Sequence, residues 1–234
     1  MTYIPLRPPR PEYRSVRGLR HRFTCWGDPA GVPVLMLHGF LDAGPTWQFL
    51  VDCLPDSWYC IAPDWRGFGD TQWPEDGYWF PDYLGDLEAM LDQLSPGEPM
   101  RVIAHSMGGN VASLYAGIRP QRVRWLADLE GFGLRPTGSD EAPERYAQWL
   151  DQIRGPEEPR RYPSSEKLAM VLRARNPRLS PDRARFVAKA WTRPCEGGVE
   201  LCADPKHRRV YPVLYRREEA LACWQRIVAP LLLI

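Results

Sequence analysis

The sequence predicts an α/β protein in which helices cover both faces of a mostly parallel sheet that carries a helical insertion. Short apolar runs alternate with helical patterns between residues 32 and 132. The apolar runs are almost unbroken, as is typical of strands buried on both faces. Strand alternation then disappears between about residues 134 and 226. We therefore expect a core of residues 1–133 and 227–234, and an insertion of residues 134–226.

The elements of the core follow from the period of the apolar residues. Residues 12–16 and 19–26 are expected to form a leading hairpin that turns at Arg17-Gly18. Buried strands are predicted at residues 32–37, 58–62, 100–104 and 123–129, and a last one at residues 229–234. Apolar residues at helical spacing predict helices over residues 84–94 and 111–118.

Helix start signals organise the insertion. Pro143 suits the first turn of a helix that continues to about residue 154, and a serine cap at 164 or 165 predicts a helix to residue 175. Ser180-Pro181-Asp182 combines a cap, a fixed φ angle and an acid in the first turn. A final helix is predicted over about residues 216–227, and we expect only helices and loops in this block.

Composition excludes several classes of function. The 234 residues contain 30 Lys and Arg against 29 Asp and Glu, and a net charge of +1 gives no general attraction to nucleic acid. No apolar run reaches the roughly 18 residues of a membrane span, and the N-terminal residues do not resemble a signal peptide. We therefore expect a cytoplasmic protein that binds neither nucleic acid nor membrane. Its oligomeric state is not predicted.

The six cysteines indicate no metal site, because they form no C-x-x-C pair and no zinc spacing. Free thiols are the favoured interpretation, with a Cys195–Cys202 disulfide as the alternative. No organic cofactor is indicated either.

The most informative motif is Ala104-His105-Ser106-Met107-Gly108-Gly109, which follows a predicted strand and precedes a predicted helix. This context is that of a nucleophile elbow, a turn so tight that the residues two before and two after the nucleophile must be small. Ala104 and Gly108 satisfy that requirement. A serine in an ordinary turn is the alternative for this motif taken alone.

Two further motifs strengthen the interpretation. His38-Gly39-Phe40 ends an earlier strand, and Asp64-Trp65-Arg66-Gly67-Phe68-Gly69-Asp70 follows the strand between. Together the three motifs resemble the α/β-hydrolase family over about residues 12–132, and the resemblance extends to residues 229–234. The lid of that family corresponds in position to residues 134–226. Asp70 departs from the pattern, because the family often has a small hydroxyl residue there.

The resemblance implies roles for these residues. Ser106 would attack an acyl carbonyl, and the backbone N–H groups of Phe40 and Met107 would form the oxyanion hole. Asp64, Arg66 and Gly67 would brace the turn after the neighbouring strand. Residues that would support the elbow and the oxyanion loop are His38, Gly39, Ala104, His105, Gly108 and Gly109, and possible pocket residues are Asp42, Trp47 and Glu130.

A serine nucleophile also needs a histidine base and an orienting carboxylate. In the family the acid and the histidine follow the two strands after the lid, which places both beyond Ile234. We therefore expect a chain truncated at its C-terminus, with the last strand and the following helices missing, and nearly inactive as written. His207 could reach Ser106 only through lid closure, and a packed or solvated histidine is the favoured interpretation. Asp128 and Glu130 end the strand from which some lipase-like relatives take their acid.

The predicted function is that of a serine hydrolase, carboxylesterase-like, which cleaves a carboxylic ester or related acyl bond of a small molecule through a Ser106 acyl-enzyme. Alternatives are C–C bond hydrolase, lyase, thioesterase, peptidase or perhydrolase chemistry, and a non-catalytic binding scaffold. Residues 151–193 contain 11 Lys and Arg against five Asp and Glu. A solvated helix face is the favoured interpretation of this bias, and an anionic substrate or acidic partner is the alternative.

Overall fold

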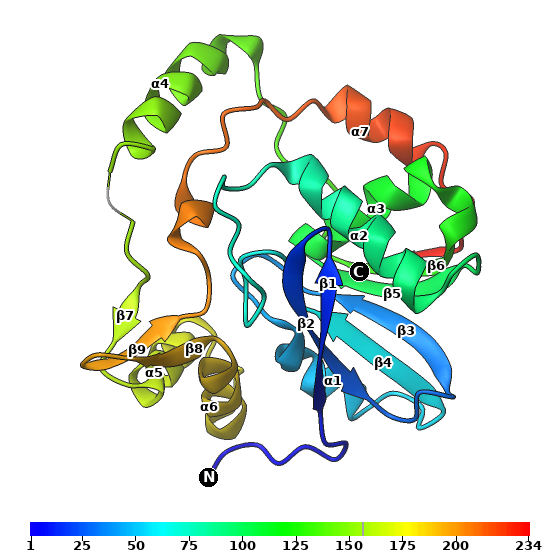
Figure 1. Ribbon diagram of the computed structural model, residues 1–234, viewed down its shortest axis with the longest axis vertical. Coiled ribbons are helices and arrows are strands. Elements are labelled where there is room, and N and C mark those ends of the chain that lie inside the picture. The colour runs from blue at the N-terminus through cyan, green and yellow to red at the C-terminus, as the bar shows by residue number, and fades with distance from the viewer. Residues whose placement is uncertain (156) are drawn as a thin grey trace.

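A seven-stranded sheet forms the centre of the computed structural model, which describes residues 1–155 and 157–234 (Figure 1). Its strands are β1 (Arg10–Val16), β2 (Leu19–Trp26), β3 (Val32–Leu37), β4 (Trp58–Pro63), β5 (Met100–His105), β6 (Val123–Leu129) and β10 (Leu231–Leu233). They lie in the order β1-β2-β4-β3-β5-β6-β10. The first two pairings are antiparallel and the other four are parallel. The carboxyl ends of the five parallel strands therefore meet at one edge.

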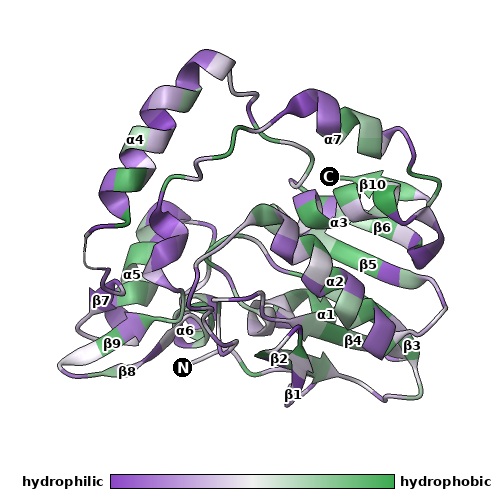
Figure 2. Ribbon diagram, turned by 45° about the horizontal axis from the view of Figure 1, so that its top comes forward, coloured by the Kyte–Doolittle hydropathy of each residue, from purple (hydrophilic) through white to green (hydrophobic). Residues whose placement is uncertain are grey.

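Helices cover both faces of this sheet. They are α1 (Gln48–Val51), preceded by η1 (Gly44–Trp47), α2 (Phe80–Leu94) and α3 (Met107–Ile118), followed by η2 (Pro120–Arg122). Helix α7 (Arg217–Trp224) packs on α3. Side chains of α2 and α3 contribute to the larger apolar cluster, and η1 and α1 contribute to the cluster on the opposite face. The strands between them are the apolar centre of the molecule (Figure 2). Burial of both faces explains why these strands are almost continuously apolar.

The core predictions are confirmed, with differences at the ends of elements. Strands β3 and β6 have the predicted bounds, and the hairpin turns at Arg17 and Gly18, whose φ angles of 46° and 83° are both positive. Helix α2 begins at Phe80, four residues before the start predicted from its apolar residues, because Pro81 suits the first turn of a helix. The short η1 and α1 were not predicted, since four-residue helices contain too little periodicity.

Residues 134–226, the block predicted as a helical insertion and called the insertion below, contain both helices and strands. Besides α7, the elements of this block are η3 (Ser139–Glu141), α4 (Ala142–Gln152), β7 (Arg161–Tyr162), α5 (Ser165–Arg175), α6 (Pro181–Ala190), β8 (Thr192–Cys195), β9 (Gly198–Leu201) and η4 (Pro205–Arg208). Strands β7, β9 and β8 form a small antiparallel sheet. The prediction that this block holds only helices and loops was wrong, because strands of two to four residues are too short for an alternation to be visible.

The N-terminal segment connects the insertion with the core. The Tyr3 hydroxyl donates a hydrogen bond to Asp52 at 2.7 Å, just after α1. The Tyr3 ring meets Phe49 of α1 edge-on at 4.9 Å and Phe186 of α6 at 6.0 Å. The backbone N–H of Tyr3 also donates to Asp182 of α6 at 3.3 Å. Residues 1–7 therefore act as a strap between α1 and α6.

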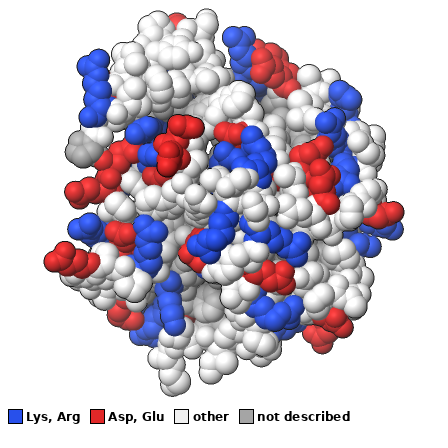
Figure 3. Space-filling view, viewed as in Figure 1, with Lys and Arg blue, Asp and Glu red and all other residues white. Residues whose placement is uncertain are grey.

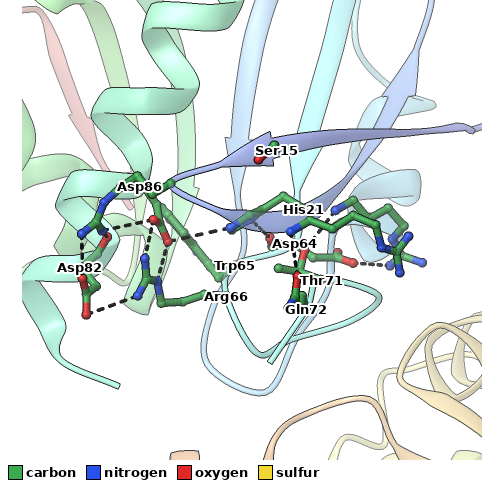
Figure 4. A network of polar contacts seen from close by, with 12 residues as sticks. Ser15, His21, Asp64, Trp65, Arg66, Thr71, Gln72, Asp82 and Asp86 are labelled. Carbon is green, nitrogen blue, oxygen red and sulfur yellow. Dashed lines mark hydrogen bonds and ion pairs between the residues drawn. The ribbon is translucent and has the colours of Figure 1, made fainter. Parts of the chain in front are cut away.

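A buried ionic network ties the leading hairpin to α2 (Figure 4). Arg66 donates two hydrogen bonds of 2.6 Å to the carboxylate of Asp86, which is fully buried. Arg17, at the hairpin turn, pairs with Asp82 and Asp86 of the same helix. Burial lowers the pKa of His21, which lies beside this network, so its imidazole is neutral near pH 7. Within the described residues, no helix has the length and apolar character that crossing a bilayer requires.

Candidate active site

Ser106 lies between β5 and α3 in a strained backbone conformation. Its φ and ψ angles are 50° and −115°, and its N–H donates a hydrogen bond of 2.9 Å to the carbonyl of Leu129. Non-glycine residues rarely adopt a positive φ, and such strain persists where the surroundings hold it. The turn from strand to helix places this serine at the carboxyl edge of the sheet, where it stays partly accessible.

Close packing around the elbow explains its small residues. A Cβ atom on Gly108 would lie 2.4 Å from the carbonyl oxygen of Leu37, and one on Gly109 would lie 2.0 Å from Oδ1 of Asp128. Ala104 is fully buried. Helix α3 therefore starts in direct contact with the ends of β3 and β6, as a nucleophile elbow requires.

The loop after β3 lies against this elbow. A Cβ atom on Gly39 would lie 2.8 Å from Nδ1 of His105 and 3.1 Å from Cβ of Ser106. Residues 39 and 40 are thus next to the serine in space. The loop is strained at Leu41, whose φ is 59°. Such a conformation costs of order 1–3 kcal/mol and needs support from neighbouring groups.

His38 supplies part of that support. Its Nε2 accepts a hydrogen bond from the Trp65 N–H at 2.9 Å, and its Nδ1 donates to the carbonyl of Gly39 at 2.8 Å. The Trp65 indole in turn donates to the His38 carbonyl at 3.0 Å. Burial lowers the pKa of His38, which keeps it neutral. The His38 side chain therefore connects the loop after β3 with the loop after β4.

The motif after β4 braces the same region. Asp64 accepts hydrogen bonds from the backbone N–H groups of Gly44 at 2.6 Å and Asp70 at 2.8 Å, and pairs with Arg22 at 2.7 Å. Asp70, the departure from the family pattern, accepts a hydrogen bond of 2.6 Å from the Tyr13 hydroxyl. The two aspartates thus link the loops at the sheet edge to the leading hairpin.

Phe40, expected to supply an amide of the oxyanion hole, and Trp47, expected near the pocket mouth, have different surroundings. Phe40 is 47% exposed. Trp47 is 8% exposed and packs in the apolar cluster under η1 and α1, so it is a core residue instead of a residue at a pocket mouth. Asp42 accepts a hydrogen bond of 2.7 Å from the indole of Trp191, at the end of α6. This contact between loop and insertion joins residues too distant in sequence to be predicted.

The loop after β6 closes the other side of the elbow. Asn110, in the first turn of α3, donates to the Ser106 carbonyl at 3.2 Å and accepts from the N–H of Gly133 at 2.8 Å. Sequence reasoning missed Asn110; an amide side chain four residues after Ser106 is the only signal for it. Glu130 is exposed in this loop, with a φ of 56°. Its N–H donates to the carbonyl of Ile234 at 2.8 Å.

Asp128 is buried behind the elbow. It is 1% exposed, and no side chain among the described residues donates a hydrogen bond to it; the backbone N–H of Gly131 is the one group beside it that favours the ionised form. Burial raises the pKa of this carboxyl to about 6. The side chain contacts the helix start and does not lie in an open site.

The four histidines are held in other ways. His21 and His38 are buried in the contacts described above, and the ring of His105 packs against Gly39. His207, in η4, is stacked between Phe68 at 3.9 Å and Tyr78 at 3.5 Å. Burial lowers the pKa of His207 to about 3. The structure does not present any of these histidines as a basic imidazole hydrogen-bonded to Ser106.

The structure also bears on the metal-ligand, cysteine and charge patterns of the sequence. The described residues hold no group of three or more His, Cys, Asp and Glu side chains arranged for a metal ion. All six cysteines are free, including Cys195 and Cys202. Basic and acidic side chains are interspersed on the face shown in Figure 3. Several basic residues of the insertion are paired, as in Arg185–Glu166 and Arg193–Glu200, which agrees with a solvated surface.

Comparison with known proteins agrees with the resemblance to the α/β-hydrolase family seen in the sequence. Residues 32–184 match the family model described as the alpha/beta hydrolase fold. A serine hydrolase-like protein of Danio rerio is 32% identical over 190 residues, which cover 78% of this chain and 58% of that protein. A cis-3-alkyl-4-alkyloxetan-2-one decarboxylase of Shewanella oneidensis is 37% identical over 106 residues, 42% of this chain and 32% of that one.

Solved structures share the fold. A thioesterase domain from the curacin biosynthetic pathway superimposes with a TM-score of 0.86 at 23% identity, covering 97% of this chain and 82% of that one. An esterase of Mycobacterium tuberculosis superimposes with a TM-score of 0.67 at 22% identity, covering 97% and 72%. The chain belongs to the α/β-hydrolase fold family. It spans less than two thirds of the length of the curated relatives named above.

Proposed function

We propose that this chain carries the nucleophile and oxyanion hole of a serine hydrolase that cleaves a carboxylic ester or related acyl bond. The observation that carries the proposal is the strained conformation of Ser106 at the start of α3, with the Gly39-Phe40 backbone against it. Ser106 Oγ would bond to the acyl carbon, and the N–H groups of Phe40 and Met107 would stabilise the oxyanion. The C–O bond to the alcohol then breaks, and water releases the acid.

The proton of Ser106 needs an acceptor, and the described histidines offer none suited to the task. Loss of a triad member typically removes about four decades of rate. We therefore propose that the 234-residue chain acylates slowly by itself. We further propose that Glu130, which is exposed, and Asp42, which lies in the loop after β3, are polar residues that would meet a substrate.

The test uses the 234-residue chain and its Ser106→Ala variant. Both are incubated with a fluorophosphonate probe, and the labelled peptide is identified by mass spectrometry. Both are also assayed with p-nitrophenyl acetate, with and without added imidazole, and the rate of the Ser106→Ala protein is subtracted to remove catalysis by imidazole alone. We expect slow labelling of Ser106 and a Ser106-dependent rate that rises with imidazole, because free imidazole replaces the base.

Two results would contradict the proposal. One concerns the nucleophile and the other concerns the missing base. Absence of any label on Ser106 after long incubation would rule out a nucleophile at the elbow. Fast Ser106-dependent turnover that does not respond to imidazole would show that the chain contains its own base.

A further inference from the structure

His207 lies in the insertion, but its ring packs beside residues 38–44, the loop after β3 that carries the Phe40 amide. This loop is called the oxyanion loop below. Its ring is stacked between Phe68 and Tyr78, and it meets the ring of Phe40 edge-on at 6.1 Å with an interplanar angle of 85°. Phe68 meets Phe40 in the same way at 5.8 Å and 79°. Two rings thus hold the Phe40 side chain, and one of them comes from the insertion.

The segment around His207 is anchored to the loop after β4. The Asp204 N–H donates to the carbonyl of Gly67 at 2.9 Å, and its carboxylate accepts from the Tyr78 hydroxyl at 2.9 Å. The Lys206 ammonium donates to the carbonyl of Glu75 at 2.8 Å. Gly67 leaves room for this arrangement, because a Cβ atom there would lie 2.6 Å from Nε2 of His207 and still closer to the Tyr78 hydroxyl.

The oxyanion loop needs such support. Leu41, next to Phe40, has a φ of 59°, which a leucine adopts only when its surroundings impose it. Amides that follow in the loop are hydrogen-bonded, at Asp42, Ala43 and Gly44. If the Phe40 ring is released, the strain at Leu41 favours opening of these bonds.

We propose that His207 is a positioning residue, which couples the docking of residues 203–209 to the geometry of the Phe40 amide. The effect on catalysis rests on the proposed function. The effect on the loop conformation rests only on the contacts described above. His207 acts through its shape. Its Nε2 is shielded from solvent, and the groups beside the ring that favour its charged form are the backbones of Arg66 and Gly67, with no carboxylate hydrogen-bonded to it in the described part of the chain to orient it as a base.

Three variants separate the possibilities. His207→Ala removes the stacked ring, and His207→Phe keeps a ring but has no nitrogen. Leu168→Ala is the matched control, because Leu168 is 3% exposed in the apolar cluster of α5 and α6 and lies outside the Phe40 contacts. Each variant and the parent chain are measured by hydrogen exchange of the peptide covering residues 38–44 and by the rate of Ser106 labelling with an uncharged fluorophosphonate.

We expect His207→Ala to raise exchange at Asp42–Gly44 and to slow labelling, each by about five- to tenfold, since several aromatic contacts are lost. His207→Phe should restore both to near the parent values, and Leu168→Ala should leave both unchanged.

Other outcomes overturn the inference. Equal loop exchange in His207→Ala and the parent chain would show that Phe40 does not depend on this ring. Equal effects of Leu168→Ala and His207→Ala would reduce the role to general stability of the insertion. Loss of labelling in His207→Phe with normal loop exchange would make His207 a proton acceptor. If Ser106 of the parent chain never labels while His207→Ala still opens the loop, the proposed function fails and the positioning role stands.

Discussion

Replacing Asp128 by asparagine should stabilise this protein at neutral pH. The carboxyl is 1% exposed, no side chain or cation in the described residues pairs with it, and the backbone N–H of Gly131 offsets only part of the desolvation penalty of its ionised form. Its pKa of about 6 lies above the ordinary value of 3.8. At about 1.4 kcal/mol for each pKa unit, the ionised group costs of order 3 kcal/mol at pH 7.5. Asparagine has almost the same shape and carries no charge.

The sign of the pH dependence follows from linkage. Between about pH 4 and 6 the native state binds more protons at Asp128 than the unfolded state does, so stability falls as pH rises. Below pH ~4 the carboxyl is protonated in both states and the penalty disappears. The difference between Asp128→Asn and the parent chain should therefore be largest above about pH 7 and small near pH 4.

Urea unfolding at several pH values, followed by tryptophan fluorescence, measures this difference. Asp86→Asn is the matched control, because Asp86 is equally buried but accepts two hydrogen bonds from Arg66. Breaking that pair should destabilise the fold by about 3–5 kcal/mol. If Asp128→Asn lowers stability at pH 7.5, or if its effect is the same at pH 4 and 7.5, the reasoning about a buried carboxylate without a cationic partner is refuted.

Two further substitutions test the packing of the core. Gly108→Ala should lower the free energy of unfolding by about 1–3 kcal/mol, because the new Cβ atom meets the carbonyl oxygens of Leu37 and His38. In the same urea titration Gly85→Ala should lower it less, because the nearest neighbour there is the end of the Arg17 side chain. Tyr3→Ala should speed hydrogen exchange of α6 by about five- to tenfold, since the strap loses its hydrogen bond to Asp52 and two ring contacts. Tyr13→Ala, which removes another tyrosine bonded to an aspartate, should leave α6 unchanged; equal exchange in both variants would show that the strap does not hold the insertion.

Much of the fold could be predicted because its signals are local. The buried strands at residues 32–37 and 123–129 were predicted with their observed bounds, since unbroken apolar runs and the turns after them lie within a few residues. The elbow at Ser106 was predicted from the small residues that its turn requires. Ser164 caps α5 as predicted, by accepting a hydrogen bond from the Lys167 N–H.

Features that depend on distant segments could not be predicted. Trp191 and Asp42 are 149 residues apart and share a hydrogen bond, and no local pattern marks either partner. The short strands β7, β8 and β9 exist because they pair with one another, which a two- to four-residue sequence cannot signal. The burial of Asp128 likewise depends on how Gly109 and Gly131 approach each other, and an isolated strand sequence does not reveal that.

By itself, the sequence determined the order of the core strands and of the longer helices, and the turn that displays Ser106, because period and turn chemistry act between neighbouring residues. Only the tertiary structure decided that His207 packs beside Phe40, that Trp47 belongs to the core, and that the carboxylate of Asp128 is buried behind the elbow. Those outcomes depend on which distant surfaces meet when apolar area is buried, and burial is a property of the whole fold.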